Sequence, residues 1–233
     1  MLISGIQKFT LLDYPEHPAC LMFTPGCNLR CGYCHNPEFV LPEEIQKIKS
    51  TFIPEQAILN FLESRRGLLY GVVISGGEPT LMPDLIPFMR TVKRRGFAIK
   101  LDTNGNRPDI LQKVIDENIV DYVAMDLKTS LENYRELTGP CAYPEFIAKS
   151  ISILKQNRVE YEFRSTLLQE IHTPEILERM AKLTDGAEKV YLQKFRPAVT
   201  LKPEFANHHP FSDEVMEDIA KQFRNYAKQV FVR

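Results

Sequence analysis

Short apolar runs alternate with longer amphipathic segments along most of the chain after residue 68. Some of these runs, such as GVVIS at 71–75 and YVAMD at 122–126, are apolar almost throughout. Parallel strands covered on both faces have this composition, because neither face meets water. The pattern predicts strands at Ala19–Thr24, Gly71–Ser75, Phe97–Asp102, Tyr122–Asp126, Val159–Thr166 and Lys189–Gln193.

The amphipathic segments between the runs carry the signals of helix ends. Two of them begin near Pro54 and Pro83 and end in basic residues followed by Gly67 and Gly96. Proline suits the first turn of a helix, cations suit the last turn, and glycine suits the residue beyond it. Helices are predicted over Pro54–Arg66, Pro83–Arg95, Pro108–Glu117, Tyr143–Gln156, Pro174–Leu183 and Asp213–Ala227, the last with Ser212 as N-cap.

Strands that alternate with helices indicate right-handed βαβ units and therefore an α/β fold with a parallel sheet. About six such units fit the chain, which is fewer than the eight of a full barrel. No low-complexity linker interrupts the alternation. We expect a single domain over residues 1–233, with a core at about 19–197 and a C-terminal helix and strand within 212–233.

The composition is that of an ordinary globular protein, with 44% hydrophobic and 25% charged residues. Lys and Arg number 29 against 30 acidic residues, a balance that argues against a nucleic-acid partner. The first residues lack the charged and apolar regions of an export signal, and no run reaches the roughly 18 apolar residues of a membrane span. We therefore expect a cytoplasmic protein with reduced thiols and no membrane partner.

Three of the five cysteines lie within eight residues, in the stretch TPGCNLRCGYCHNP at 24–37. An odd number of cysteines in a reducing compartment favours a metal or cluster site over a disulfide scaffold. Residues 31–35 also match the C-x-x-C-H pattern of haem attachment. The haem interpretation is weak, because it requires export and leaves Cys27 without a role.

An iron-sulfur cluster and a zinc ion remain as alternatives for this stretch. Cys27, Cys31 and Cys34 can each bind one iron of a cubane, which leaves the fourth iron open to a substrate. Zinc would add His35, but adjacent side chains rarely converge on one small tetrahedral ion, so zinc ranks second. Cys20 and Cys141 are expected to be packing or incidental thiols.

Polar residues and glycines follow the predicted strands, at the end where parallel α/β enzymes place their chemistry. Gly76-Gly77-Glu78-Pro79 suits a ligand laid against the backbone, and Glu78 could accept from a ligand ammonium. Asp102, Thr103 and Asn104 offer oxygens to hydroxyls or to a cation. Lys128, two residues after Asp126, could meet a carboxylate or phosphate, and Arg164 lies near the fifth strand. Each of these groups also has a plain interpretation as a turn or a solvated ion pair.

Together these motifs resemble the radical S-adenosylmethionine (SAM) superfamily. The resemblance is carried by CNLRCGYC, with an aromatic residue before its third cysteine, and by GGEP and DTNG on successive units. GIQKFTLLDYP, CHNP, VAMDLK and LQKFRP resemble the proteins that activate glycyl radical enzymes, most closely the anaerobic ribonucleoside-triphosphate reductase activating type. The match extends from Gly5 to about Pro203.

The resemblance implies a partial (β/α)6 TIM-like barrel, the radical SAM core. It also implies one [4Fe-4S] cluster whose open iron binds SAM, since 35–75 has no further cysteine set. Such enzymes cleave SAM reductively, and the 5′-deoxyadenosyl radical abstracts hydrogen from a glycine of a partner protein. The implied partners are a glycyl radical enzyme and a flavodoxin or ferredoxin as reductant.

The resemblance also implies roles by position. Cys27, Cys31 and Cys34 would ligate the cluster. Tyr33 would lie near the adenine, and Gly76, Gly77 and Glu78 would bind the methionyl ammonium. Asp102, Thr103 and Asp126 would face the carboxylate side, where related activators hold a monovalent cation. Lys128 and Arg164 would contact the carboxylate or ribose region, and Asp13 would lie near the partner's glycine.

One position departs from the pattern of the pyruvate formate-lyase activator, because Phe195 stands where that activator has a histidine. His172 precedes a helix start and is expected at the surface. Two other functions remain open: a radical SAM enzyme acting on a different glycyl radical enzyme or a small purine-like or pterin-like molecule, and a non-enzymatic zinc or iron-sulfur binding protein. The short chain, with no C-terminal substrate or cluster domain, favours a protein substrate.

Overall fold

A computed structural model describes residues 1–197 and 199–233 of the chain. The described residues form two compact units, and each is built from more than one segment of the chain. Unit 1 comprises Met1–Asn28, Asn36–Thr103 and Asp109–Val123, and unit 2 comprises Leu29–His35, Asn104–Pro108 and Ala124–Arg233.

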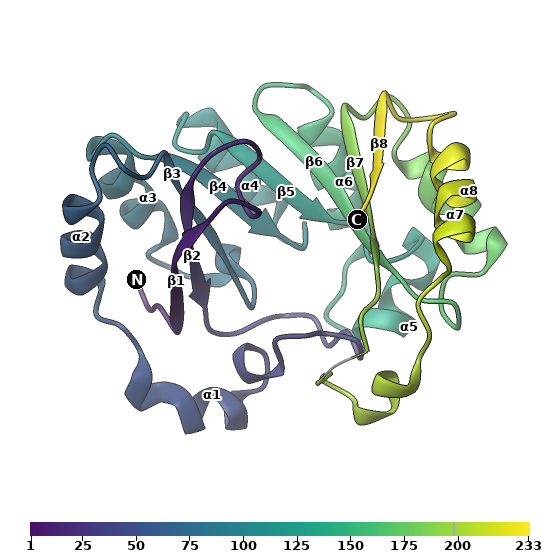
Figure 1. The fold of residues 1–233 in the computed structure, drawn as a ribbon, viewed down its shortest axis with the longest axis horizontal. Coiled ribbons are helices and arrows are strands. Elements are labelled where there is room, and N and C mark those ends of the chain that lie inside the picture. Colours follow the sequence, from purple (N-terminus) through teal and green to yellow (C-terminus); the bar gives the residue numbers. More distant parts are fainter. Residues whose placement is uncertain (198) are drawn as a thin grey trace. The chain divides into compact units, whose positions relative to one another are not determined.

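The sheet of unit 1 is mostly parallel. Strand β2 (Ala19–Thr24) pairs in parallel with β3 (Gly71–Gly76), which pairs in parallel with β4 (Ala98–Thr103). An additional strand, β1 (Gly5–Thr10), pairs antiparallel with β2 (Figure 1). The parallel register aligns the carboxyl ends of β2 and β3, since Thr24 lies opposite Gly76.

The helices of unit 1 follow its strands in the order that βαβ units require. Helix α3 presents the buried side chains of Leu85, Phe88, Met89 and Val92 from one face, at helical spacing. The helices are α1 (Pro42–Ile48), α2 (Glu55–Ser64), α3 (Leu85–Arg94) and α4 (Pro108–Asp116).

Unit 2 contains a second run of strands, in which β6 (Glu160–Leu167) pairs in parallel with β7 (Lys189–Lys194) and β7 with β8 (Gln229–Val232). These strands lie side by side in that order (Figure 1). Strand β5 (Tyr122–Asp126) leads into this unit. The helices are α5 (Tyr134–Thr138), α6 (Pro144–Leu154), α7 (Pro174–Leu183) and α8 (Asp213–Phe223).

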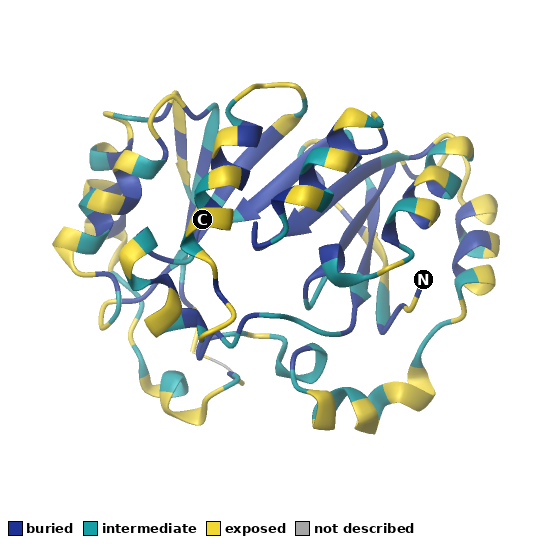
Figure 2. Cartoon of the chain, turned by 180° about the vertical axis from the view of Figure 1, so that it is seen from behind, coloured by how far each residue is buried: buried dark blue, intermediate teal, exposed yellow. Residues whose placement is uncertain are grey.

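Burial explains why the apolar runs became strands. Figure 2 shows most of the central strands as buried, whereas the helices expose one face and bury the other. In β3, Val72, Val73 and Ile74 have no exposed surface. Such a run is stable only where both faces of the sheet are covered, as the sequence indicated.

The predicted α/β class, the strands and the helices are confirmed, with boundaries that differ by a few residues at most. Ser212 caps α8 as expected, because its hydroxyl accepts from the Val215 N–H at 3.3 Å. The sequence analysis did not identify β1, α1 or α5. Strand β1 exposes Gln7, Lys8 and Phe9, so it lacks the apolar run by which the other strands were found.

Among the described residues, no helix combines the length and the apolarity that a bilayer crossing requires.

Candidate cofactor site

The cysteine triplet lies immediately after β2. Cys27 is half-buried and belongs to unit 1, whereas Cys31 and Cys34 lie in the segment 29–35 that belongs to unit 2. A tight turn joins the last two, in which the Cys34 N–H donates to the Cys31 carbonyl at 3.1 Å. Burial raises the pKa of the Cys31 thiol to about 12, and the charge of Lys128 opposes that shift. Binding of iron would therefore displace a proton from Cys31.

His35, the fourth ligand of the zinc alternative, has partners of its own within unit 2. Within the part of the chain that is described, no three Cys, His, Asp or Glu side chains are grouped closely enough to hold one ion. His35 is engaged elsewhere, because its Nε2 donates to the Arg196 carbonyl at 2.9 Å and its ring stacks on Phe195. The contacts of His35 argue against its use as a zinc ligand. A cubane places fewer demands on convergence, because each cysteine binds a different iron.

Tyr33, between the two cysteines of unit 2, carries a buried polar atom that the chain leaves unsatisfied. Its side chain is 4% exposed, and its hydroxyl has no hydrogen-bond partner among the described residues. Buried hydroxyls without a partner are uncommon and call for an explanation, such as a ligand that supplies one. The position of Tyr33 is thus compatible with a bound cofactor.

The two glycines of the GGEP turn are required by the neighbouring backbone. A Cβ on Gly77 would stand 2.1 Å from the Gly26 carbonyl oxygen, and Gly76 adopts φ +117° against the backbone of Thr24. Two hydrogen bonds hold this approach: the Gly77 N–H donates to Thr24 at 2.8 Å and the Glu78 N–H to Gly26 at 2.7 Å. The glycines therefore bring Glu78 next to the start of the cysteine loop, within unit 1.

Glu78 is a buried carboxylate held by threonines. It is 1% exposed, and its Oε1 accepts from the Thr80 N–H at 3.1 Å and the Thr80 hydroxyl at 2.5 Å. The Thr103 hydroxyl donates to the same oxygen at 2.8 Å. These donors follow two neighbouring strands, so the fold brings together the carboxylate of Glu78 and the hydroxyl of Thr103. The three contacts fix the position of the Glu78 carboxylate.

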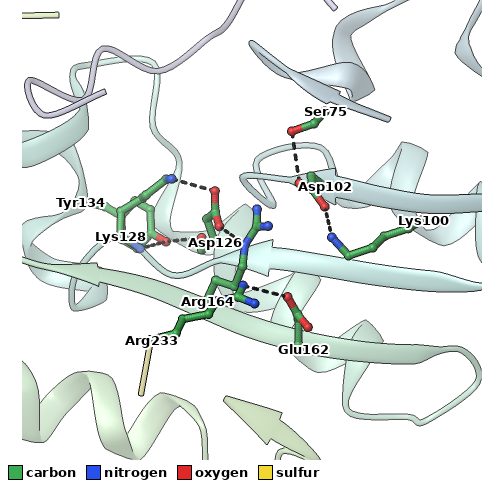
Figure 3. Close-up of polar contacts among 9 residues, drawn as sticks. All are labelled: Ser75, Lys100, Asp102, Asp126, Lys128, Tyr134, Glu162, Arg164 and Arg233. Carbon is green, nitrogen blue, oxygen red and sulfur yellow. Dashed lines mark hydrogen bonds and ion pairs between the residues drawn. The ribbon is translucent and has the colours of Figure 1, made fainter. Parts of the chain in front are cut away.

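Asp102, at the end of β4, is paired inside unit 1 with a lysine of the same strand. The Lys100 Nζ donates to Asp102 Oδ1 at 2.5 Å, and the Ser75 hydroxyl donates to Oδ2 at 3.1 Å (Figure 3). Lys100 itself is 1% exposed. The carboxylate is thus compensated by a buried ammonium of the chain.

Asp126, at the end of β5, is the centre of a second polar group, within unit 2. Lys128 Nζ donates to Oδ2 at 2.8 Å and Arg164 Nε donates to Oδ1 at 2.9 Å (Figure 3). Burial alone would raise the pKa of Asp126, but the charges of Arg164 and Lys128 hold this pKa far below its usual value. The carboxylate in turn holds the pKa of Lys128 well above its usual value, against the effect of burial. All three groups therefore stay ionised.

Tyr134 and His172 support the backbone of the same segment. The Lys128 N–H donates to the Tyr134 hydroxyl at 3.0 Å, and His172 Nε2 donates to the Lys128 carbonyl at 3.1 Å. The expectation that His172 lies at the surface was wrong, because it is 1% exposed. The histidine is buried because it satisfies both Lys128 and the Leu168 N–H, which donates to Nδ1 at 3.0 Å.

The remaining predicted residues have local partners. The Asn104 side-chain oxygen accepts from the Asn106 N–H at 3.0 Å, which closes the turn after β4. Asp13 follows β1 and is half-buried, and the Thr10 hydroxyl donates to its Oδ2 at 2.5 Å. Neither contact excludes a ligand, and both match the plain interpretation of these residues as turn formers.

The expected monovalent cation does not fit these carboxylates. Asp102 already carries the Lys100 ammonium, and Asp126 already carries Lys128 and Arg164. A further cation at either carboxylate would meet the positive charge of those side chains.

Lys100 and Tyr134 were missed by the sequence analysis, and His172 was placed at the surface instead of in the polar group of Lys128. Lys100 could have been found, because a lysine inside the apolar strand AIKLDT shares its strand face with Asp102 two residues later. Tyr134 and His172 carry no local signal, since their partners are created by the fold.

Comparison with known proteins identifies related chains. Residues 21–184 match the model of the radical SAM superfamily. A protein of Methanocaldococcus jannaschii named as a glycyl-radical enzyme activating enzyme is 31% identical over 100% of this chain and 95% of its own length. A pyruvate formate-lyase-activating enzyme of Clostridium pasteurianum is 30% identical over 59% of this chain and 57% of its own.

Among solved structures, QueE from Escherichia coli has a similar fold. It superposes with a TM-score of 0.58 at 16% sequence identity, over 100% of this chain and 93% of QueE. At this identity the likeness concerns the fold alone, and it agrees with the mostly parallel α/β architecture described above.

Proposed function

Because this chain belongs to the radical SAM superfamily, we propose that it activates a glycyl radical enzyme by abstracting hydrogen from a glycine of that partner. The observation that carries the proposal is the similarity to the Methanocaldococcus jannaschii protein, which extends over the full length of this chain. The proposal includes one [4Fe-4S] cluster and SAM, which the superfamily implies. Together they supply a 5′-deoxyadenosyl radical once the cluster is reduced.

The cysteine loop and the GGEP turn would bind these groups. Cys27, Cys31 and Cys34 would hold the cluster, and the absence of a fourth cysteine nearby in the sequence would leave one iron for SAM. Glu78 would accept from the methionyl ammonium, because it is a buried carboxylate that Thr80 and Thr103 hold in place beside the start of the cysteine loop. The unsatisfied Tyr33 hydroxyl would gain its partner in the bound state.

The Asp126 group would orient the rest of SAM. Lys128 and Arg164 are fixed by the same carboxylate and remain cationic, so they can donate to a ligand carboxylate or to ribose hydroxyls. No side chain is required to act as acid or base. The role of the chain is to position the groups and to exclude water from the radical.

We assign the partner to the anaerobic ribonucleoside-triphosphate reductase class, on the resemblance of GIQKFTLLDYP, VAMDLK and LQKFRP. Phe195, where the pyruvate formate-lyase activator has histidine, separates the chain from that activator. Asp13 would lie near the partner's glycine, a flavodoxin or ferredoxin would supply the electron, and the reaction would take place in the cytoplasm.

Anaerobic reconstitution with iron and sulfide tests the enzymatic part. After reduction in the presence of SAM, the protein should yield 5′-deoxyadenosine and methionine. Cys31→Ser should abolish the product because a cluster ligand is lost, whereas Cys141→Ser, at an exposed cysteine outside the triplet, should retain it. A cluster-loaded protein that yields no 5′-deoxyadenosine would overturn the proposal and favour a binding protein.

The partner is tested by electron paramagnetic resonance. An anaerobic ribonucleoside-triphosphate reductase from the same organism should acquire a glycyl radical doublet when incubated with the reduced protein and SAM. A doublet on another glycyl radical enzyme only, or turnover of a purine-like or pterin-like molecule without any doublet, would refute this assignment.

A further inference from the structure

Lys100 is placed on the face of β4 where a charged side chain is least expected. In a strand, residues two apart share a face, so Lys100 lies on the same face as Ala98 and Asp102. Ala98 packs against an apolar cluster, and Val73, which belongs to that cluster, is the register partner of Lys100 on β3. The cluster consists of Tyr14, Ala19, Leu21, Val73 and Tyr122.

The ammonium is kept in this position by one carboxylate. The side chains of Lys100 and Asp102 are 2% and 12% exposed, and Nζ and Oδ1 are 2.5 Å apart. Without that carboxylate the buried ammonium would be an uncompensated charge, which a low-dielectric site disfavours. The pair is stable only as a unit, with the Ser75 hydroxyl donating to the other carboxylate oxygen.

The resemblance to the radical SAM superfamily implied that Asp102 lies beside bound SAM. It also implied that a monovalent cation is held at this carboxylate. On the proposed function, we infer that Lys100 is a built-in replacement for that cation. Its ammonium supplies the single positive charge that compensates Asp102, and it does so from inside the strand. Binding of SAM by this chain therefore needs neither K⁺ nor Na⁺.

The second carboxylate supports the same conclusion independently. Asp126 is compensated by Lys128 and Arg164 within unit 2. Each of the two carboxylates therefore already has at least one cation of its own unit at hydrogen-bond distance. A monovalent ion would have to displace a side chain that is held at 2.5 to 2.9 Å.

Ion binding tests the inference without any enzymatic reaction. Thallium(I), a probe for K⁺ sites, is titrated into the reconstituted protein and followed by ²⁰⁵Tl NMR, with choline chloride holding the ionic strength constant. The wild-type protein should show no saturable binding. Lys100→Met removes the ammonium and leaves Asp102, so this variant should acquire a saturable site.

Two further variants keep the test decisive. Lys100→Met combined with Asp102→Asn removes both charges and should bind no thallium, and Lys100→Arg should behave as the wild type. Saturable binding to the wild-type protein that Asp102→Asn abolishes would overturn the inference even if Lys100→Met failed to fold. A folded Lys100→Met variant that binds no thallium would also overturn it.

SAM affinity provides the second readout, by calorimetry in KCl against choline chloride. The wild-type affinity should be the same in both salts. The SAM affinity of Lys100→Met should be about tenfold or more higher in KCl than in choline chloride. A coupling of this size between two ligands is ordinary. If the wild-type protein binds SAM in neither KCl nor choline chloride, the proposed function fails. The thallium titration still decides the role of Lys100 in that case.

Discussion

Glu78, Lys100 and His172 are each 1% exposed, and each has specific hydrogen-bond partners. Glu78 accepts from threonines, Lys100 donates to Asp102, and His172 joins two stretches of main chain. Burial of such groups is tolerated because each is paired, whereas removal of one partner leaves the other unsatisfied. At the residue scale, the polar groups near the candidate site are thus fixed by fold-specific partners.

His172 gives a pH-dependent prediction at this scale. Since the Leu168 N–H donates to Nδ1, we assign the proton of the neutral ring to Nε2, which faces the Lys128 carbonyl. Burial lowers the pKa of His172 below 6.5 in the folded state. As pH falls, His172 therefore binds a proton in the unfolded chain before it does so in the folded chain. The free energy of unfolding should accordingly fall as pH drops below about 6.5.

Two variants check this assignment by urea unfolding between pH 8 and pH 5. His172→Ala should lose about 1–3 kcal/mol at pH 8, because two buried backbone groups lose their partner. His172→Gln, which cannot titrate, should have a flatter pH dependence than the wild type. An unchanged slope in His172→Gln would show that another group causes the pH dependence.

At the scale of elements, the described segment 199–208 lies on the cysteine loop within unit 2. The Leu201 N–H donates to the Cys34 carbonyl at 3.1 Å and the Lys202 N–H to the Gly32 carbonyl at 3.0 Å. Phe205 lies against Gly32, where a Cβ would stand 2.2 Å from its ring, and its ring also faces Tyr33. The segment therefore holds the backbone of the loop and covers it.

Phe205→Ala should weaken this cover. The side chain is half-buried, so we expect a loss of about 1–2 kcal/mol, less than for a fully buried phenylalanine. The reconstituted variant should lose its visible cluster absorption faster than the wild type when exposed to air or to a chelator. Phe146→Ala, at an exposed position on α6, serves as the matched control and should lose the cluster at the wild-type rate.

If Phe205→Ala and the wild type lose the cluster equally fast, the segment 199–208 does not protect the cysteine loop. Its two backbone hydrogen bonds would then have a purely structural role.

At the scale of the whole molecule, ligand binding should be visible in stability. A ligand that binds only the folded state stabilises it by about 2.7 kcal/mol at a concentration 100 times its Kd. Anaerobic calorimetry should therefore show a rise in Tm when SAM is added to the reconstituted protein. The Cys31→Ser variant should show little or no rise, because SAM would lack its iron.

An equal rise in Tm for the wild type and for Cys31→Ser would show that SAM binds without the cluster. The proposed arrangement of the cofactor would then be wrong, whatever the rest of the fold contributes.

Much of the fold could be predicted because its signals are local. Buried parallel strands leave continuous apolar runs such as Gly71–Ser75, and helix ends leave caps such as Ser212. Strand β1 was not predicted, because an exposed edge strand has no apolar run of this kind. The candidate site was predicted as a list of residue types that follow successive strands, without their partners.

The sequence alone determined the α/β class, the order of the elements and the spacing of the three cysteines, because periodicity and spacing are properties of short segments. The tertiary structure decided the burial of His172, the close approach of Gly77 to Gly26 and the side chains that neutralise each carboxylate. These contacts join residues on different elements, or depend on which strand face is buried. Their energies therefore exist only once the elements have packed.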